Sequence, residues 1–78
     1  MRPTAFVMIN AEIGKEEIVL KYLTEELEVD EAYMVYGVYD LVAKISSESM
    51  KDLKDVVINN IRQAEGVRST LTMVIVRE

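Results

Sequence analysis

The order of its strand-like and helix-like segments constrains the fold of this 78-residue chain more than any other feature. A β-favouring stretch over residues 4–12 precedes an amphipathic stretch over 15–27, and two β-favouring runs follow between residues 31 and 45. A second amphipathic stretch begins at Ser49, and a last β-favouring run covers residues 67–76. A chain of this length supports one compact domain.

Both amphipathic stretches have their apolar residues at helical spacing. In the first, Glu16 and Glu17 occupy the opening turn, where the helix dipole favours anions. In the second, Ser49 precedes Asp52 by three residues, the spacing of a capping box, and Gly66 suits a C-terminal cap. The apolar stripes comprise Ile18, Val19, Tyr22, Leu23 and Leu27 in the first helix and Met50, Leu53, Val56, Val57, Ile61 and Ala64 in the second.

The stretch between residues 31 and 45 predicts two strands joined by a bend. Gly37 lacks a side chain and so frees the backbone, while Asp40 is of the type that bonds locally to turn amides. We therefore expect a hairpin whose bend lies between Gly37 and Asp40.

The resulting order is strand, helix, strand, strand, helix, strand, which is the split βαβ plan. Right-handed crossovers place both helices on the same side of the sheet. The sequence therefore predicts a single α+β domain over residues 1–78 with a ferredoxin-like βαββαβ fold. Its four-stranded antiparallel sheet carries two helices on one face.

The other face of this sheet is also expected to be apolar. On the first strand Ala5, Val7 and Ile9 alternate with Phe6 and Met8, so that both faces are hydrophobic. The last strand repeats the pattern, with Leu71, Met73 and Ile75 alternating with Val74 and Val76. A contiguous apolar face on a soluble domain is usually an interface. We expect the chain to dimerise through this face, which gives a short chain a larger core.

The composition excludes several kinds of chemistry. With no Cys and no His, the chain has no disulfide, no thiolate or imidazole metal site and no Ser-His or Cys-His nucleophile. Its three glycines are isolated, so it has no phosphate-binding loop. We expect no enzyme activity, no metal and no cofactor, because the paired carboxylates fall on helix surfaces or caps: Glu25 with Glu26, and Asp52 with Asp55.

Charge and hydropathy limit the partners. A net charge of −5 disfavours direct binding to nucleic acid. The apolar runs are interrupted by charge and are too short for a membrane span, and the N-terminus lacks the pattern of a secretory signal. We therefore expect a cytoplasmic protein that binds neither membrane nor DNA.

Three of the four tyrosines cluster around the predicted hairpin bend: Tyr33, Tyr36 and Tyr39. Cross-strand aromatic packing with ordinary turn chemistry explains this cluster. A small-ligand pocket explains it equally, because Gly37 lets a ligand approach the backbone and Asp40 offers a carboxylate. Both interpretations remain open from the residues alone.

The hairpin resembles a known family. Residues 36–41, Tyr-Gly-Val-Tyr-Asp-Leu, are similar to the Thr-Gly-x-Tyr-Asp-(apolar) signature of the effector-binding domain, or RAM domain, of the Lrp/AsnC regulators of amino acid metabolism. Residues 66–75 resemble the closing segment of that domain, in which a Gly-Val turn leads into a strand with alternate Thr positions. The opening residues 4–9 are similar too, so the resemblance covers essentially the whole chain.

The resemblance implies dimers that face each other through their sheets, rings of four or five dimers (an octamer or decamer), and an amino acid bound near the hairpins where dimers meet. Carried over by residue, Gly37, Tyr39 and Asp40 would lie at the backbone of the bound amino acid, and Tyr36 stands where the signature has Thr. On the last strand Thr70 and Thr72 would offer hydroxyls. The family's helix-turn-helix has no counterpart here, so we expect a stand-alone effector domain.

Three functions remain open. The first is an amino acid sensing and oligomerisation module that modulates transcription or amino acid metabolism indirectly, by co-assembly with full-length Lrp/AsnC regulators. The second is a small dimeric enzyme, because ferredoxin-like dimers also host catalysis. The third is a purely structural oligomerisation module without a ligand.

Overall fold

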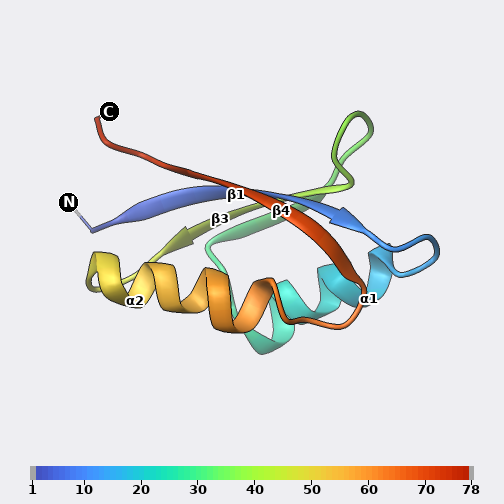
Figure 1. The fold of residues 1–78 in the computed structure, drawn as a ribbon, viewed down its shortest axis with the longest axis horizontal. Coiled ribbons are helices and arrows are strands. Elements are labelled where there is room, and N and C mark those ends of the chain that lie inside the picture. The colour runs from blue at the N-terminus through green and yellow to red at the C-terminus, as the bar shows by residue number, and fades with distance from the viewer. Residues whose placement is uncertain (1, 78) are drawn as a thin grey trace.

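The computed structural model describes residues 2–77, which form a four-stranded antiparallel sheet with two helical segments along one face (Figure 1). The fold is therefore the expected ferredoxin-like α+β sandwich. Its elements are β1 (Thr4–Ala11), α1 (Glu16–Lys21) with the π-helical η1 (Tyr22–Glu26), β2 (Glu31–Met34), β3 (Leu41–Ser46), α2 (Met50–Asp55) with the π-helical η2 (Val56–Ile61), and β4 (Val67–Val74).

Each helix begins close to its expected residue. The side chain of Ser49 accepts a hydrogen bond of 3.1 Å from the backbone N–H of Asp52, which confirms the predicted N-terminal cap of α2. The second helix ends earlier than the sequence suggested, at Ile61, and Arg62 occupies its C-terminal cap. The expectation that Gly66 caps this helix was wrong, because a turn separates Gly66 from the end of the helix at Ile61.

β1 lies at the centre of the sheet. The strand order is β2-β3-β1-β4, and β1 pairs antiparallel with β3 on one side and with β4 on the other. Val7, for example, lies opposite Ala43 of β3 and Thr72 of β4. Residues that lie opposite each other on neighbouring strands point their side chains to the same face of the sheet. Because Val7 is buried, its face is the one that the helices cover.

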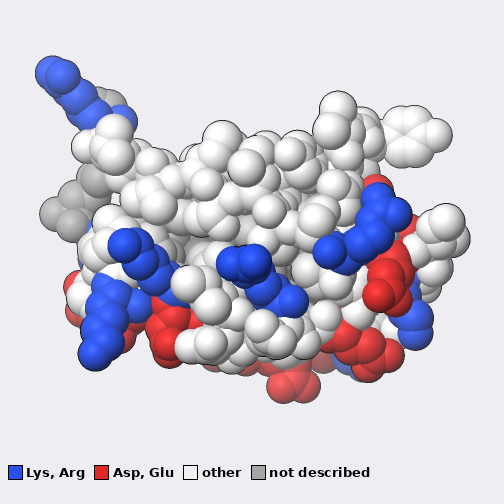
Figure 2. Space-filling model, in the orientation of Figure 1, with Lys and Arg blue, Asp and Glu red and all other residues white. Residues whose placement is uncertain are grey.

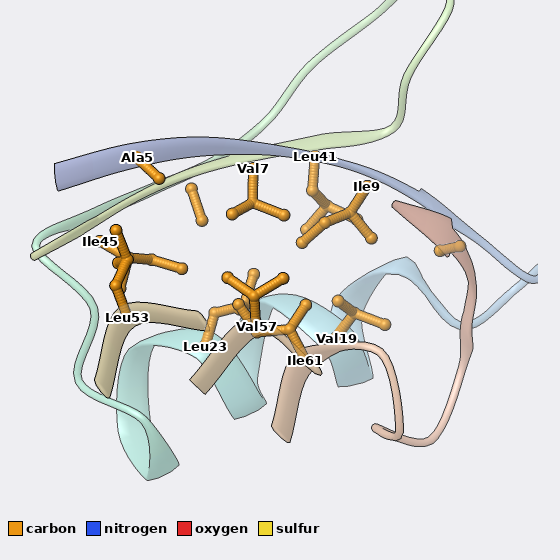
Figure 3. Close-up of a cluster of buried hydrophobic side chains, with 12 residues drawn as sticks. Ala5, Val7, Ile9, Val19, Leu23, Leu41, Ile45, Leu53, Val57 and Ile61 are labelled. Carbon is orange, nitrogen blue, oxygen red and sulfur yellow. The ribbon is translucent and has the colours of Figure 1, made fainter. Parts of the chain in front are cut away.

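The hydrophobic core lies between the helix-covered face and the two helices (Figure 3). The two inner strands and the helices all contribute side chains that water does not reach. The most completely buried large ones are Ile9, Leu23, Leu41, Leu53, Ile61, Val7 and Val19. Burying each such side chain contributes about 1.5–3 kcal/mol, so this layer provides most of the stability of the single chain.

The opposite face of the sheet is open and apolar at its centre. Phe6 is 37% exposed, Leu71 47% and Met73 45%, and the register places them together with Met8 on this outer face. Toward β2 the outer face becomes polar. There Glu31 receives a hydrogen bond from the Tyr33 hydroxyl and forms an ion pair with Lys44 across the strands.

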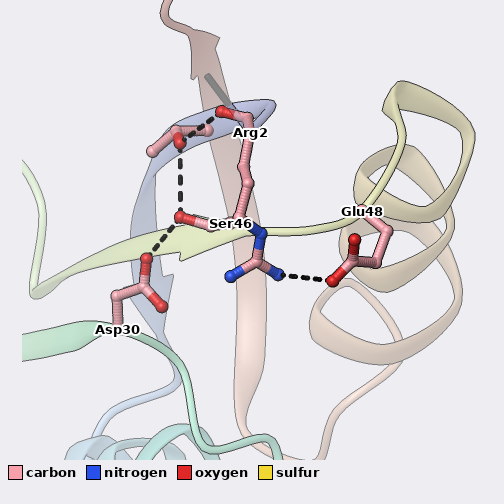
Figure 4. Close-up of polar contacts among 5 residues, drawn as sticks. Arg2, Asp30, Ser46 and Glu48 are labelled. Carbon is pink, nitrogen blue, oxygen red and sulfur yellow. Dashed lines mark hydrogen bonds and ion pairs between the residues drawn. The ribbon is translucent and has the colours of Figure 1, made fainter.

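Polar contacts hold the first residues of β1 to their neighbours (Figure 4). The hydroxyls of Thr4 and Ser46 lie 3.2 Å apart across the β1–β3 pair, and the Ser46 hydroxyl also donates to Asp30 before β2. Arg2 forms an exposed ion pair of 3.6 Å with Glu48. These contacts join the starts of β1, β2 and α2 at one end of the sheet.

The turn before β4 packs tightly against α1. Gly66 is buried and has φ +89°, a conformation that favours glycine, and its carbonyl accepts a 2.7 Å hydrogen bond from the N–H of Glu12. A Cβ at this position would lie 2.8 Å from Cβ of Lys15 and 3.2 Å from Cγ2 of Val19. The helix can approach this closely only because residue 66 has no side chain.

Gly66→Ala should therefore lower the free energy of unfolding by about 2–4 kcal/mol, through backbone strain and through overpacking against α1. Gly14→Ala is the matched control, because Gly14 has a similar φ of +84° but its Cβ would meet nothing within 4 Å. We expect Gly14→Ala to lower the free energy of unfolding by about 1 kcal/mol. Urea unfolding at a fixed protein concentration measures both. Equal losses would contradict the close packing of α1 on this turn.

Candidate functional site

The hairpin between β2 and β3 projects beyond the sheet at one end (Figure 1). The connection covers residues 35–40, which include the predicted bend from Gly37 to Asp40, and it is closed by a 2.9 Å hydrogen bond from the N–H of Val35 to the carbonyl of Asp40. Tyr36 is fully exposed at the tip and Val38 nearly so. A Cβ at Gly37 would meet nothing within 4 Å, so the backbone there is open to another molecule.

Asp40 fastens this hairpin to the end of β1. Its backbone N–H donates to the carbonyl of Ile9 at 2.9 Å, and its carboxylate Oδ2 accepts from the N–H of Ala11, also at 2.9 Å. The β1–β4 register shifts between Asn10 and Ala11, and the carboxylate binds the strand at this irregularity. Asp40 is thus a structural acceptor through one oxygen, whatever its other oxygen binds.

Thr70 and Thr72 lie on the helix-facing side of β4, opposite the buried Ile9 and Val7. They line a groove of about 470 Å³ between β4 and the α2–η2 helix. We call this the α2–β4 groove. Its other lining side chains include Leu53, Val57, Ile58 and Val74, and the cations Lys54 and Arg62.

The structure separates the two halves of the site expected from the sequence. The α2–β4 groove contains Thr70 and Thr72 but none of residues 36–40. Because β1 lies between β3 and β4, the backbones of β3 and β4 are two strand spacings apart, about 10 Å. Within one chain, Tyr36, Gly37, Tyr39 and Asp40 therefore form one group and the two threonines another.

No pattern in the sequence singled out Lys54 and Arg62. They are eight residues apart in sequence, and only the position of β4 beside this helix makes them part of a groove. Their spacing of two helical turns was the one available signal, and surface pairs of this kind are common.

Other chemistry has little support in the described part of the chain. Among residues 2–77, no group of three or more Asp and Glu is placed to hold a metal ion, and no polar side chain is buried. No helix within that range is long and apolar enough to cross a membrane. The hydrogen bond from Tyr33 to Glu31, together with the negative charge of Glu31, raises the pKa of the Tyr33 hydroxyl above its ordinary value.

Comparison with known proteins identifies the family. The Lrp/AsnC ligand binding domain matches residues 4–78, which is nearly the whole chain. The chain belongs to the Lrp/AsnC family. The hairpin and the closing strand on which the sequence resemblance rested both lie within the matched residues.

Among its relatives, this Lrp/AsnC domain is 32% identical over 73 residues to the HTH-type transcriptional regulator FL11 of Pyrococcus furiosus. That match covers 94% of this chain but 48% of FL11, so the chain spans about half the length of the curated relative. Similar solved structures include the hypothetical protein PHS023 of Pyrococcus horikoshii, at 38% identity and a TM-score of 0.87, with coverage of 97% of this chain and 92% of that one. AsnC of E. coli is 27% identical, with a TM-score of 0.88, and the match covers 99% of this chain and 52% of AsnC.

Removing the carboxylate of Asp40 should loosen the hairpin. Asp40→Ala leaves the N–H of Ala11 without its acceptor and should lower the free energy of unfolding by about 1–2 kcal/mol. Asp40→Asn keeps an oxygen at the same place and should cost less than half of that. Denaturant unfolding of both variants gives the comparison. If the two variants lose the same free energy of unfolding, the carboxylate of Asp40 does not stabilise the hairpin through its hydrogen bond to Ala11.

Proposed function

We propose that this domain senses an amino acid and assembles into oligomers in the cytoplasm, and that it modulates transcription indirectly by joining full-length Lrp/AsnC regulators. The observation that carries this proposal is the family match over residues 4–78, which coincides with only half of a relative named as an HTH-type transcriptional regulator. In this proposal the ligand-binding half that the chain shares with such regulators provides the surfaces for assembly with them. Co-purification with a regulator of this kind is the direct test of the partner.

The outer face of the sheet supports assembly. Phe6, Met8, Leu71 and Met73 form an apolar centre, and the polar contacts of Glu31 border it on the β2 side. An apolar centre with a polar rim is the usual arrangement of a protein interface. In this proposal two copies bury these faces against each other and form the dimer.

The effector site then lies between copies. No pocket lining of the described chain contains both the hairpin and the two threonines, and in this proposal a ligand meets the hairpin of one copy and β4 of another. An amino acid needs acceptors for its ammonium group and donors for its carboxylate. The free oxygen of Asp40 and the loop carbonyls supply the first, and amides near Gly37 with the hydroxyls of Thr70 and Thr72 supply the second.

In this proposed site, Tyr36 and Tyr39 flank the ligand. Tyr36 occupies the position where the family signature has a smaller Thr, so its ring narrows the space for the effector.

The two alternative functions, a small enzyme and a structural module without a ligand, have less support. An enzyme would need a catalytic group in a dry pocket, and the described residues bury no polar side chain. The thermal-shift screen described below would support a structural module if none of the twenty amino acids binds.

A thermal-shift screen against the twenty amino acids tests the sensing function. A ligand at one hundred times its dissociation constant should stabilise the native state by about 2.7 kcal/mol, which raises the melting temperature. For the amino acid that scores, calorimetry should show that Asp40→Asn weakens binding by roughly 1.5–3 kcal/mol and Thr72→Val by roughly 0.5–1.5 kcal/mol.

Thr24→Val is the matched control for the hydroxyl, because Thr24 is exposed on η1 and bonds only to carbonyls of its own helix. It should leave the affinity unchanged. Unchanged affinity in both the Asp40 and Thr72 variants would place the pocket elsewhere. A screen without any hit would favour the structural module.

The dimer is tested by placing a charge on the outer face. Met73→Asp would bury an unpaired carboxylate at the interface, at a cost of about 3 kcal/mol or more, which weakens association at least a hundredfold. Met50→Asp is the control, because Met50 is similarly exposed at 40% but lies at the start of α2. Light scattering at micromolar concentration should show that only the first variant dissociates. A wild-type chain that is monomeric, or two variants that associate alike, would refute this interface.

A further inference from the structure

Positive charge surrounds the two threonines of the proposed effector site. The α2–β4 groove contains both threonines, and the charged side chains that line it are Lys54 and Arg62. A smaller hollow of about 270 Å³ lies at the start of β4, where Arg62 and Arg68 line it together with Thr70. Neither hollow has an acidic residue in its lining, although the chain as a whole carries a net charge of −5.

Figure 2 shows this separation of charge. Lys and Arg side chains form a row across this face, and the acidic side chains gather toward the helices below. The ion pairs among residues 2–77 join Arg2 to Glu48, Lys15 to Glu65 and Lys44 to Glu31. Within that range, the guanidinium groups of Arg62 and Arg68 therefore form no ion pair with a carboxylate.

A bulge brings Arg68 into the smaller hollow. β1 advances by one residue, from Asn10 to Ala11, while its partner in β4 changes from Ser69 to Val67, so Arg68 is the extra residue. An extra residue bends its strand and changes the direction of a side chain. Arg62 reaches the same hollow from the C-terminal cap of η2. Two different elements thus supply two guanidinium groups beside Thr70.

The other polar groups of the proposed site leave these two cations without a partner. Asp40 and the loop carbonyls accept from the ammonium group of the effector, and the threonine hydroxyls and loop amides donate to its α-carboxylate. At a junction between copies the site loses water, and a charge that loses water without gaining a partner is costly. A neutral effector side chain would leave both guanidinium groups unpaired, and a basic one would be repelled.

We propose that the effector is an amino acid with a carboxylate side chain, aspartate or glutamate, and that Arg62 and Arg68 bind this carboxylate. The inference rests on the proposed sensing function and names the class of effector for that site. The ammonium group meets Asp40 of one copy, and the side-chain carboxylate lies in the hollow beside Thr70 of the other. A guanidinium group suits this task because it donates two parallel hydrogen bonds to a carboxylate.

Comparison of each acid with its amide tests this directly, because the two ligands have nearly the same shape and differ in side-chain charge. Calorimetry at constant ionic strength measures L-glutamate against L-glutamine and L-aspartate against L-asparagine. At least one acid should bind about tenfold or more tightly than its amide. Sodium chloride should reduce this preference, because salt screens the interaction between charges.

Variants of the two arginines add a second readout. Arg62→Gln and Arg68→Gln should each weaken binding of the acid about tenfold and leave binding of the amide unchanged. Arg2→Gln is the matched control, because Arg2 precedes β1 whereas Arg68 lies opposite the end of that strand. It should change neither affinity. All three side chains are exposed, so melting temperatures without ligand should stay close to that of the unmodified chain.

Several results would overturn this inference. Tighter binding of a neutral or basic amino acid would do so and would leave the sensing function intact. An equal loss with Arg2→Gln would show unspecific attraction, and an equal loss of acid and amide in the Arg62 and Arg68 variants would show that the arginines do not recognise the side chain. Equal binding of glutarate, which lacks the ammonium group, would exclude an amino acid as the preferred ligand. Absence of binding by all twenty amino acids would overturn the sensing function as well.

Discussion

The unequal covering of the sheet is the constraint on which the rest of this structure depends. Two helices cover one face and bury the side chains of its central strands, while the other face presents Phe6, Leu71 and Met73 to solvent in the single chain. A domain of 78 residues has only a small hydrophobic core. The additional apolar area that a second layer would bury on this face therefore matters to its stability. In the proposed dimer the same face serves both stability and assembly, and the second copy supplies the layer that the single chain lacks.

β1 connects this constraint to the candidate sites. As the central strand it pairs with β3 and β4, and its end binds Asp40 through both the backbone and the carboxylate. It also separates the hairpin from the groove beside β4. In the proposed function a ligand meets the hairpin of one copy and β4 of another, so effector binding and assembly are coupled there. A ligand at such a junction stabilises the assembled state by mass action.

The sequence predicted local structure well because local patterns determine it. The stripe of apolar residues and the Ser49 cap located both helices, and Gly37 with Asp40 located the bend. The tertiary contacts were harder to predict. Gly66 looked like a helix cap, whereas its use depends on Lys15 and Val19, some fifty residues away in sequence. Lys54 and Arg62 became candidates only when β4 was placed beside α2, and no periodicity in the chain specifies that neighbour.

The central claim, that a second copy covers the outer face, is tested most directly by methyl NMR of the methionines in the unmodified protein. Met73 and Met50 are exposed to nearly the same degree in the single chain, at 45% and 40%, but only Met73 lies on the outer face. A soluble paramagnetic agent should broaden the methyl signal of Met50 strongly and leave those of Met73 and Met8 protected. Equal broadening of Met50 and Met73 at concentrations well above micromolar would contradict the account.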